Sequence, residues 1–179
     1  MLLLKSCNVT QLTQHLQNLS SLKNLTLISI QSNRLTAPSL EHLSILPNLT
    51  DLYISHNAID SLAPLAFSKN LRIIDASSNP ISSLSGLETH THLEEVWASN
   101  CQLESFEMIE KVLADKEELT TVYFEGNPLQ KRQMVLYRNK VRLALPRIKQ
   151  IDASEFCVAA VNVVVGIDAD SLLAYVRVE

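Results

Sequence analysis

The chain has 179 residues, 46% of them hydrophobic, a formal net charge of -4 at pH 7 and a pI near 5.7. It can bury a substantial core, but the negative charge argues against nucleic acid as the main partner, because binding of phosphates depends on an excess of Lys and Arg. Three cysteines do not make a disulfide framework, which indicates a reducing compartment, so we expect the protein in the nucleus and cytoplasm. No stretch approaches the ~20 apolar residues of a membrane span.

One pattern of apolar residues recurs from the first residues onward. An incomplete copy opens the chain with Leu2, Leu4, Cys7 and Val9. The two clearest complete copies read Leu22-x-x-Leu25-x-x-Ile28-x-Ile30-x-x-Asn33-x-Leu35 and Leu46-x-x-Leu49-x-x-Leu52-x-Ile54-x-x-Asn57-x-Ile59. Three further copies place Asn79, Cys101 and Asn127 in the Asn position, so that the copies follow one another every 22 to 26 residues. This period and spacing are the leucine-rich-repeat signature.

Each position in the copy has a physical role. The Leu-x-Leu alternation has period two, so both Leu side chains point inward and the residue between them points outward from a strand. One copy cannot bury its apolar side alone, and stacking of copies supplies the core. The inward Asn can bond backbone groups of its own and the adjacent coil, and Cys is a small buried substitute for it.

Helical segments are predicted between some strands and at the end of the array. The two longest intervals contain residues 12–19 and 106–113, where the extra residues fit about one more helical turn. After Asn127 the pattern becomes helical over 134–145 and ends at Pro146, and an extended half-copy follows before Asp152. A helix with a half-copy is what a C-terminal cap needs to cover the last coil.

These patterns divide the chain into three parts. Residues 1–129 are leucine-rich repeats, 130–153 form the C-terminal cap, and 154–179 are a divergent tail that is a candidate for disorder. The first coil has no cap of its own, which favours a fragment of a longer array. We predict an α/β leucine-rich-repeat solenoid with a parallel concave β-sheet, short helical or 3-10 convex segments and a C-terminal helical cap.

The sequence does not contain the motifs that are typical of catalytic, cofactor-binding or metal-binding sites. Its three glycines cannot build a P-loop or a dinucleotide loop, and Cys157 has no evident base partner. His90 and His92 are two residues apart, which suits no metal-ligand signature, and we predict that both are surface histidines. We therefore expect no enzyme activity, no cofactor and no metal.

The outward residue between the two strand Leu positions is the best candidate for a binding site. That position holds Leu3, Ser29, Tyr53, Asp75, Trp97 and Tyr123. Successive strands lie about 4.8 Å apart, so these residues form one column, and Glu95 faces the same side as Trp97. Exposed aromatic residues on a rigid surface are typical anchors for protein partners, although they can also pack laterally to stiffen the sheet. The predicted protein-binding residues are Tyr53, Asp75, Glu95, Trp97 and Tyr123.

The cap residues resemble those of an intracellular family of leucine-rich-repeat regulators. The residues that carry the resemblance are Tyr137-Arg138, Val141, Leu145-Pro146, Ile148 and Ile151-Asp152. The family is that of protein phosphatase 1 regulatory subunit 7, and the likeness runs from about Met1 to Ala153 over the C-terminal half of its members. It implies contact with the phosphatase through the concave face, where Asp75, Glu95, Trp97 and Tyr123 match the family's contact residues. Members usually have about twice as many repeats.

The leading functional hypothesis is a non-enzymatic regulatory scaffold that binds the protein phosphatase 1 catalytic subunit through the concave face, and is otherwise monomeric. One alternative is a spliceosomal leucine-rich structural protein of the A-prime type, for which the seven bases of residues 131–149 would matter most. Another is a truncated, nonfunctional copy. The ten acids of residues 88–125 and these seven bases also have a plainer interpretation, as two solvated faces that attract each other.

Overall fold

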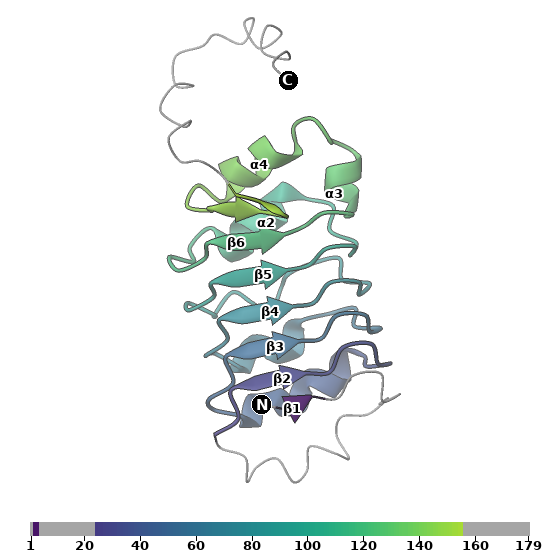
Figure 1. Ribbon diagram of the computed structural model, residues 1–179, viewed down its shortest axis with the longest axis vertical. Helices are drawn as coiled ribbons and strands as arrows, with labels where there is room; N and C mark the ends of the chain where they lie inside the picture. The colour runs from purple at the N-terminus through teal and green to yellow at the C-terminus, as the bar shows by residue number, and fades with distance from the viewer. Residues whose placement is uncertain (1, 4–23, 156–179) are drawn as a thin grey trace, which may run out of the picture.

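Eight strands form a single sheet in the computed structural model, which describes residues 2–3 and 24–155 (Figure 1). Their spatial order follows the chain, and every neighbouring pair is parallel except the last, which is antiparallel. The strands are β1 (Leu2–Leu3), β2 (Leu27–Ser29), β3 (Asp51–Tyr53), β4 (Ile73–Asp75), β5 (Glu95–Trp97), β6 (Thr121–Tyr123), β7 (Gln150–Ile151) and β8 (Ser154–Glu155). The predicted leucine-rich-repeat solenoid is therefore confirmed.

The register of the sheet confirms which strand residues point inward. Neighbouring Cα atoms pair Ile28 with Leu52, Leu52 with Ile74, Ile74 with Val96 and Val96 with Val122, and all five side chains are buried. Strands of only three residues hold this register because a one-residue slip would turn the apolar side chains to the solvent face.

The Asn positions form a ladder of buried hydrogen bonds between coils. Asn79 donates through Nδ2 to the carbonyls of Ile54 and Ala76, both at 3.0 Å, and its Oδ1 accepts from the Ile59 N–H at 3.0 Å. Cys101 donates through Sγ to the Ala76 carbonyl at 3.5 Å, as expected for a substitute in that position. Each such residue satisfies backbone groups that the stacked coils bury.

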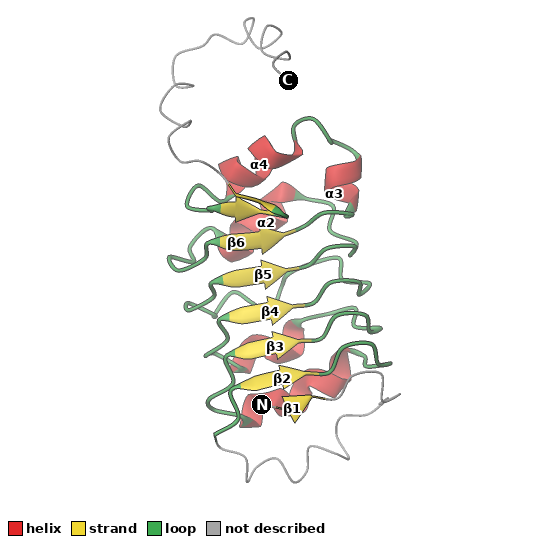
Figure 2. Ribbon diagram, in the orientation of Figure 1, coloured by secondary structure: helices red, strands yellow, loops and turns green. Residues whose placement is uncertain are grey.

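Short helices lie behind the sheet, as predicted, in every described interval from β2 to β6 except the one between β4 and β5 (Figure 2). They are the 3-10 helices η2 (Ala37–Ile45) and η3 (Ala63–Phe67) and the α-helix α2 (Phe106–Leu113). The α-helix α2 occupies one of the longest intervals between copies, and Ser105 caps it by accepting from the Met108 N–H at 3.3 Å. The predicted helical segment 12–19, Cys7 and residues 156–179 of the predicted tail lie outside the described residues.

The cap consists of α3 (Pro128–Lys131), α4 (Tyr137–Ala144), β7 and β8. The helix begins at Tyr137 rather than at residue 134, and the preceding apolar residues are exposed. Asp152 takes the bridging role of the ladder Asn, because its Oδ1 accepts from the N–H groups of Phe124 and Glu125 at 3.0 and 3.1 Å and from the Tyr137 hydroxyl at 3.2 Å. The strand β8 contains the first two residues of the predicted tail.

The prediction that His90 lies on the surface is wrong. Its ring is fully buried, and neither ring nitrogen has a hydrogen-bond partner among the described residues. Beside it in the same interior, Lys116 donates through Nζ to the Glu88 carbonyl at 2.6 Å and to Asp115 Oδ1 at 2.7 Å. His92 is exposed, with Nδ1 3.2 Å from Glu118 Oε1. Spacing along the chain could not separate the two histidines, because stacking of adjacent coils buries one and not the other.

Candidate functional site

The structure brings the five predicted protein-binding residues together on one face of the sheet. The pairing of β2 to β6 aligns Ser29, Tyr53, Asp75, Trp97 and Tyr123 in one column. Glu95 lies in the next column, aligned with Ile73 and Thr121. We call the column residues Tyr53, Asp75, Trp97 and Tyr123, with Glu95, the concave cluster. Its role in binding stays a prediction.

The three aromatic rings of the concave cluster contact one another. The ring centroids of Tyr53 and Trp97 are 6.2 Å apart with an interplanar angle of 73°, and those of Trp97 and Tyr123 are 5.3 Å apart at 59°. These are edge and tilted arrangements, which aromatic rings prefer to a face-to-face stack. Lateral packing and partner binding are therefore compatible, because half-buried rings that are already ordered lose little entropy when a partner covers them.

Hydrogen bonds fix the polar ends of two rings. The Trp97 indole donates through Nε1 to Glu95 Oε2 at 2.9 Å, and Gln150 donates through Nε2 to the Tyr123 hydroxyl at 2.6 Å. Gln150 belongs to the cap strand β7, and the repeat pattern did not predict it as a site residue. The pairing of β7 with β6 places Gln150 beside Thr121, and continuing the strand register into the cap would have identified it.

Asp75 is buried, whereas a residue that contacts a partner is expected to be exposed. Its side chain is only 5% exposed, and its carboxylate accepts from Gln31 Nε2 at 3.0 Å and from the Ser77 N–H at 3.1 Å. Tyr53 and Trp97 lie on the flanking strands and contact each other across it. Asp75 therefore supplies negative charge beneath the rings and little contact surface of its own.

The concave cluster has a negative electrostatic environment. Burial raises the pKa of the Tyr53 hydroxyl above its ordinary value, and the carboxylates of Asp51, Glu95 and Asp75 raise it further. A face that combines aromatic rings with carboxylates favours cationic side chains, which bind ring faces and ion-pair with the acids.

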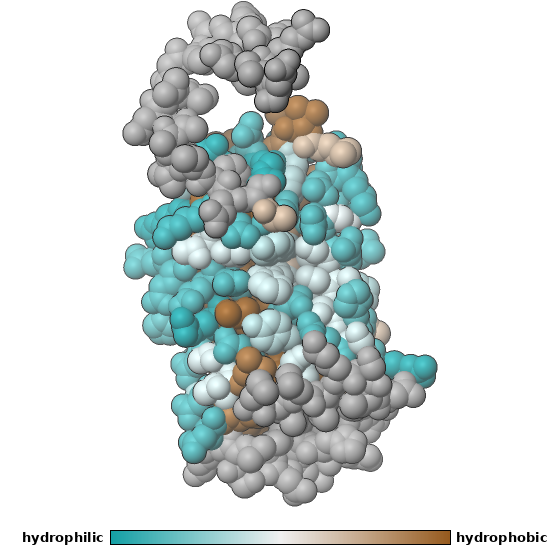
Figure 3. All heavy atoms as spheres, in the orientation of Figure 1, coloured by the Kyte–Doolittle hydropathy of each residue, from teal (hydrophilic) through white to brown (hydrophobic). Residues whose placement is uncertain are grey.

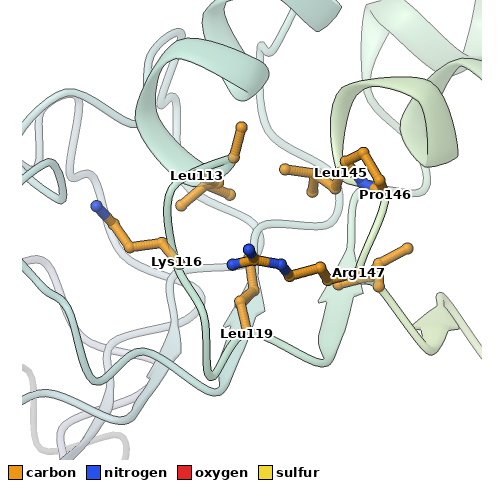
Figure 4. A pocket seen from close by; sticks show the side chains of 8 residues that line it. Leu113, Lys116, Leu119, Leu145, Pro146 and Arg147 are labelled. Carbon is orange, nitrogen blue, oxygen red and sulfur yellow. The ribbon is translucent and has the colours of Figure 1, made fainter.

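The described part of the chain offers no metal site, and its cavity between the ends of α2 and α4 is small. No group of three or more metal-ligating side chains occurs among residues 2–3 and 24–155, and no helix there is long and apolar enough to span a bilayer. The cavity in Figure 4, between α2 and the end of α4, encloses about 10 Å³, which is room for about one water. Lys116 points away from Arg147 in that view, and the space is too small for a cofactor.

Comparisons with known proteins agree with the repeat fold. The family model described as Leucine rich repeat matches residues 23–81. Protein phosphatase 1 regulatory subunit SDS22 of Schizosaccharomyces pombe is 55% identical over 74 residues, which are 41% of this chain and 21% of that protein. The human geranylgeranyl transferase type-2 subunit alpha is 35% identical over 89 residues, which are 49% of this chain and 16% of that protein.

Among solved structures, an internalin (InlF) from Listeria monocytogenes has a TM-score of 0.60 and 23% identity over 77% of this chain and 37% of its own. This likeness shows the fold alone. The matched part of the chain spans about a fifth of the length of the phosphatase regulator and less of the transferase subunit. The regulatory relative and the repeat fold both support the prediction that the chain is not an enzyme.

Proposed function

Since the chain is a leucine-rich-repeat protein similar to a protein phosphatase 1 regulatory subunit, we propose that it binds the catalytic subunit of protein phosphatase 1 through the concave cluster and so regulates that enzyme. The observation that carries the proposal is the contacting trio of Tyr53, Trp97 and Tyr123 on the exposed face of the sheet, beside the carboxylate of Glu95. Aromatic residues that are large, ordered and partly exposed are the residues that dominate binding energy at protein interfaces.

The polar groups around the rings define the partner surface. Glu95 holds the Trp97 indole and still has its second carboxylate oxygen, Oε1, for a donor from a partner. Asp51 and Asp75 add negative charge near Tyr53. We therefore expect the bound surface of the phosphatase to present Lys or Arg side chains over the rings.

The test is a binding titration of the full chain with purified phosphatase catalytic subunit. We expect Trp97→Ala to weaken binding by about thirtyfold, because truncation of a buried aromatic anchor often costs about 2 kcal/mol. The matched control is Phe67→Ala, since Phe67 is also an exposed aromatic residue, but it belongs to η3 behind the sheet. Equal retention of the phosphatase by the wild type and Trp97→Ala would rule out the concave cluster as the site.

A further inference from the structure

A groove of about 510 Å³ lies between α2 and α4, and none of its lining residues belongs to the sheet. On one side it is lined by Phe106, Glu107 and Glu110 of α2, and on the other by Lys140, Leu143 and Ala144 of α4. The groove is therefore separate from the concave cluster, and a partner could occupy it while the sheet face is covered.

The α4 side of the groove belongs to an unusually apolar exposed surface. Leu143 is 77% exposed, and Met134, Val135 and Leu136, which lead into α4, are 76%, 90% and 51% exposed. Figure 3 shows brown, apolar atoms at this upper end of the molecule, over the segment that joins α3 to α4. Leu136, Lys140 and Leu143 are spaced by four and three residues, so they lie along one face of the helix. Clustered exposed apolar residues mark interaction sites.

The opposite side of the groove is acidic. Glu104, Glu107 and Glu110 line it, and all three are exposed. Glu104 pairs with Arg132 at 3.0 Å, and Glu107 accepts from the Ser105 hydroxyl at 3.2 Å. The Lys140 ammonium lies 5.6 Å from the Phe106 ring centroid, within the range of a cation-π contact. A ligand for this groove must therefore be apolar on one side and carry positive charge toward α2.

The charges of the groove distinguish between possible occupants. Residues 156–179 of this chain carry Asp168, Asp170 and Glu179 but only one base, Arg177, so they match the acidic side poorly. A basic amphipathic helix from another protein matches both sides, because a helix packs its apolar face into a groove through residues spaced by three, four and seven.

We propose that the groove between α2 and α4 is a second docking site, which binds an amphipathic helix of a partner protein. Apolar residues of that helix contact Phe106 and Leu143, and its Lys or Arg residues pair with Glu107 and Glu110. The chain then acts as a scaffold with two independent surfaces, the sheet face and the cap groove.

The proposal is tested with the full chain and a designed helical peptide that carries Leu on one face and Lys beside it. A twin peptide has Glu in place of every Lys. We expect the Lys peptide to bind and to shift the amide NMR signals of α2 and α4. Leu143→Ser should weaken this binding about tenfold. The double change Glu107→Lys and Glu110→Lys should abolish binding of the Lys peptide and permit binding of the Glu twin.

The control variant is Phe67→Ser, which removes an exposed apolar residue of η3 and should leave peptide binding unchanged. Equal binding of both peptides, or shifts confined to other elements, would overturn the proposal. So would a photo-reactive side chain at position 143 that cross-links to residues 156–179 or to a second copy of the chain. Retention of the phosphatase by Leu143→Ser should equal that of the wild type, which separates this test from that of the concave cluster.

Discussion

At the scale of single residues, burial decides what a polar side chain can do. Trp97 and Asp75 occupy successive places in one column of the sheet, yet the indole is half-exposed and the carboxylate is covered. The difference arises because long aromatic side chains reach over the short acid between them. One position in the repeat can therefore hold a contact residue in one coil and a supporting charge in the next.

His90 is the clearest case of a buried titratable group. Burial lowers the pKa of its imidazole below the ordinary 6.5, and the nearby Lys116 ammonium lowers it further. The backbone of Leu87, Leu65 and Ser68 favours the charged ring, but burial outweighs it. The ring is therefore neutral inside the folded protein at a pH where an unfolded chain would already bind the proton.

This shift predicts a pH dependence of stability. Above pH 6.5 the ring is neutral in both states, whereas below it the unfolded state takes up a proton first, so the free energy of unfolding decreases as the pH falls. The slope can reach about 1.4 kcal/mol per pH unit for one group. In urea denaturation from pH 7.5 to 5.5, we expect His90→Leu to lose less stability than the wild type. His92→Leu is the control. If the free energy of unfolding of His92→Leu changed with pH as little as that of His90→Leu, the pH dependence could not be assigned to His90.

At the scale of elements, the coils share one strand geometry and differ behind the sheet. Intervals of 22 residues between Asn positions leave room only for 3-10 helix or turns, whereas the interval of 26 residues between Cys101 and Asn127 holds the α-helix α2. The coil between β4 and β5 has no helix and depends on a turn at Gly86, where φ is 110°. A side chain is poorly tolerated in that conformation.

We predict that replacing Gly86 by a residue with a side chain destabilises the protein more than the same change at Gly126. A Cβ at Gly86 would lie 2.3 Å from the Leu62 carbonyl oxygen, which is backbone of the previous coil, while a Cβ at Gly126 would meet the side-chain Oδ1 of Asn100 at 2.1 Å. Asn100 is exposed and can rotate away, but the Leu62 backbone cannot. We expect Gly86→Ala to cost about 2 to 4 kcal/mol and Gly126→Ala about 1 kcal/mol in the free energy of unfolding. Equal losses in thermal denaturation would show that backbone approach is not the cause.

At the scale of the whole molecule, a continuous apolar core contributes more to stability than the interactions between charged side chains. Buried residues from Leu25, just before β2, to Ile151 in the cap form one cluster. The acidic repeats and the basic cap do meet, at Arg132–Glu104 (3.0 Å) and Arg147–Glu117 (3.8 Å), but all four side chains are largely exposed. The plainer interpretation of the charge asymmetry, two solvated faces in weak attraction, agrees with these contacts.

The contributions of the apolar core and of the exposed ion pairs to stability can be compared by measuring the free energy of unfolding of variants. We expect Arg132→Ala and Arg147→Ala each to cost less than about 1 kcal/mol, because water and salt screen exposed ion pairs. Ile74→Ala, in the fully buried centre of β4, should cost about 2 to 5 kcal/mol while the protein still unfolds in one transition. A loss from the Arg variants as large as that from Ile74→Ala would reverse this order.

The order of residues along the chain was enough to predict the repeat, the register of the strands and the members of the aromatic column. Those features follow from a period-two alternation and a fixed spacing to Asn, which depend on neighbours along the chain or one coil away. The burial of Asp75, His90 and Lys116 became visible only in the folded protein, as did the groove between α2 and α4, which is apolar on one side and acidic on the other. Burial and grooves depend on the sizes of side chains in adjacent coils and on helix packing, and no spacing within one repeat encodes them.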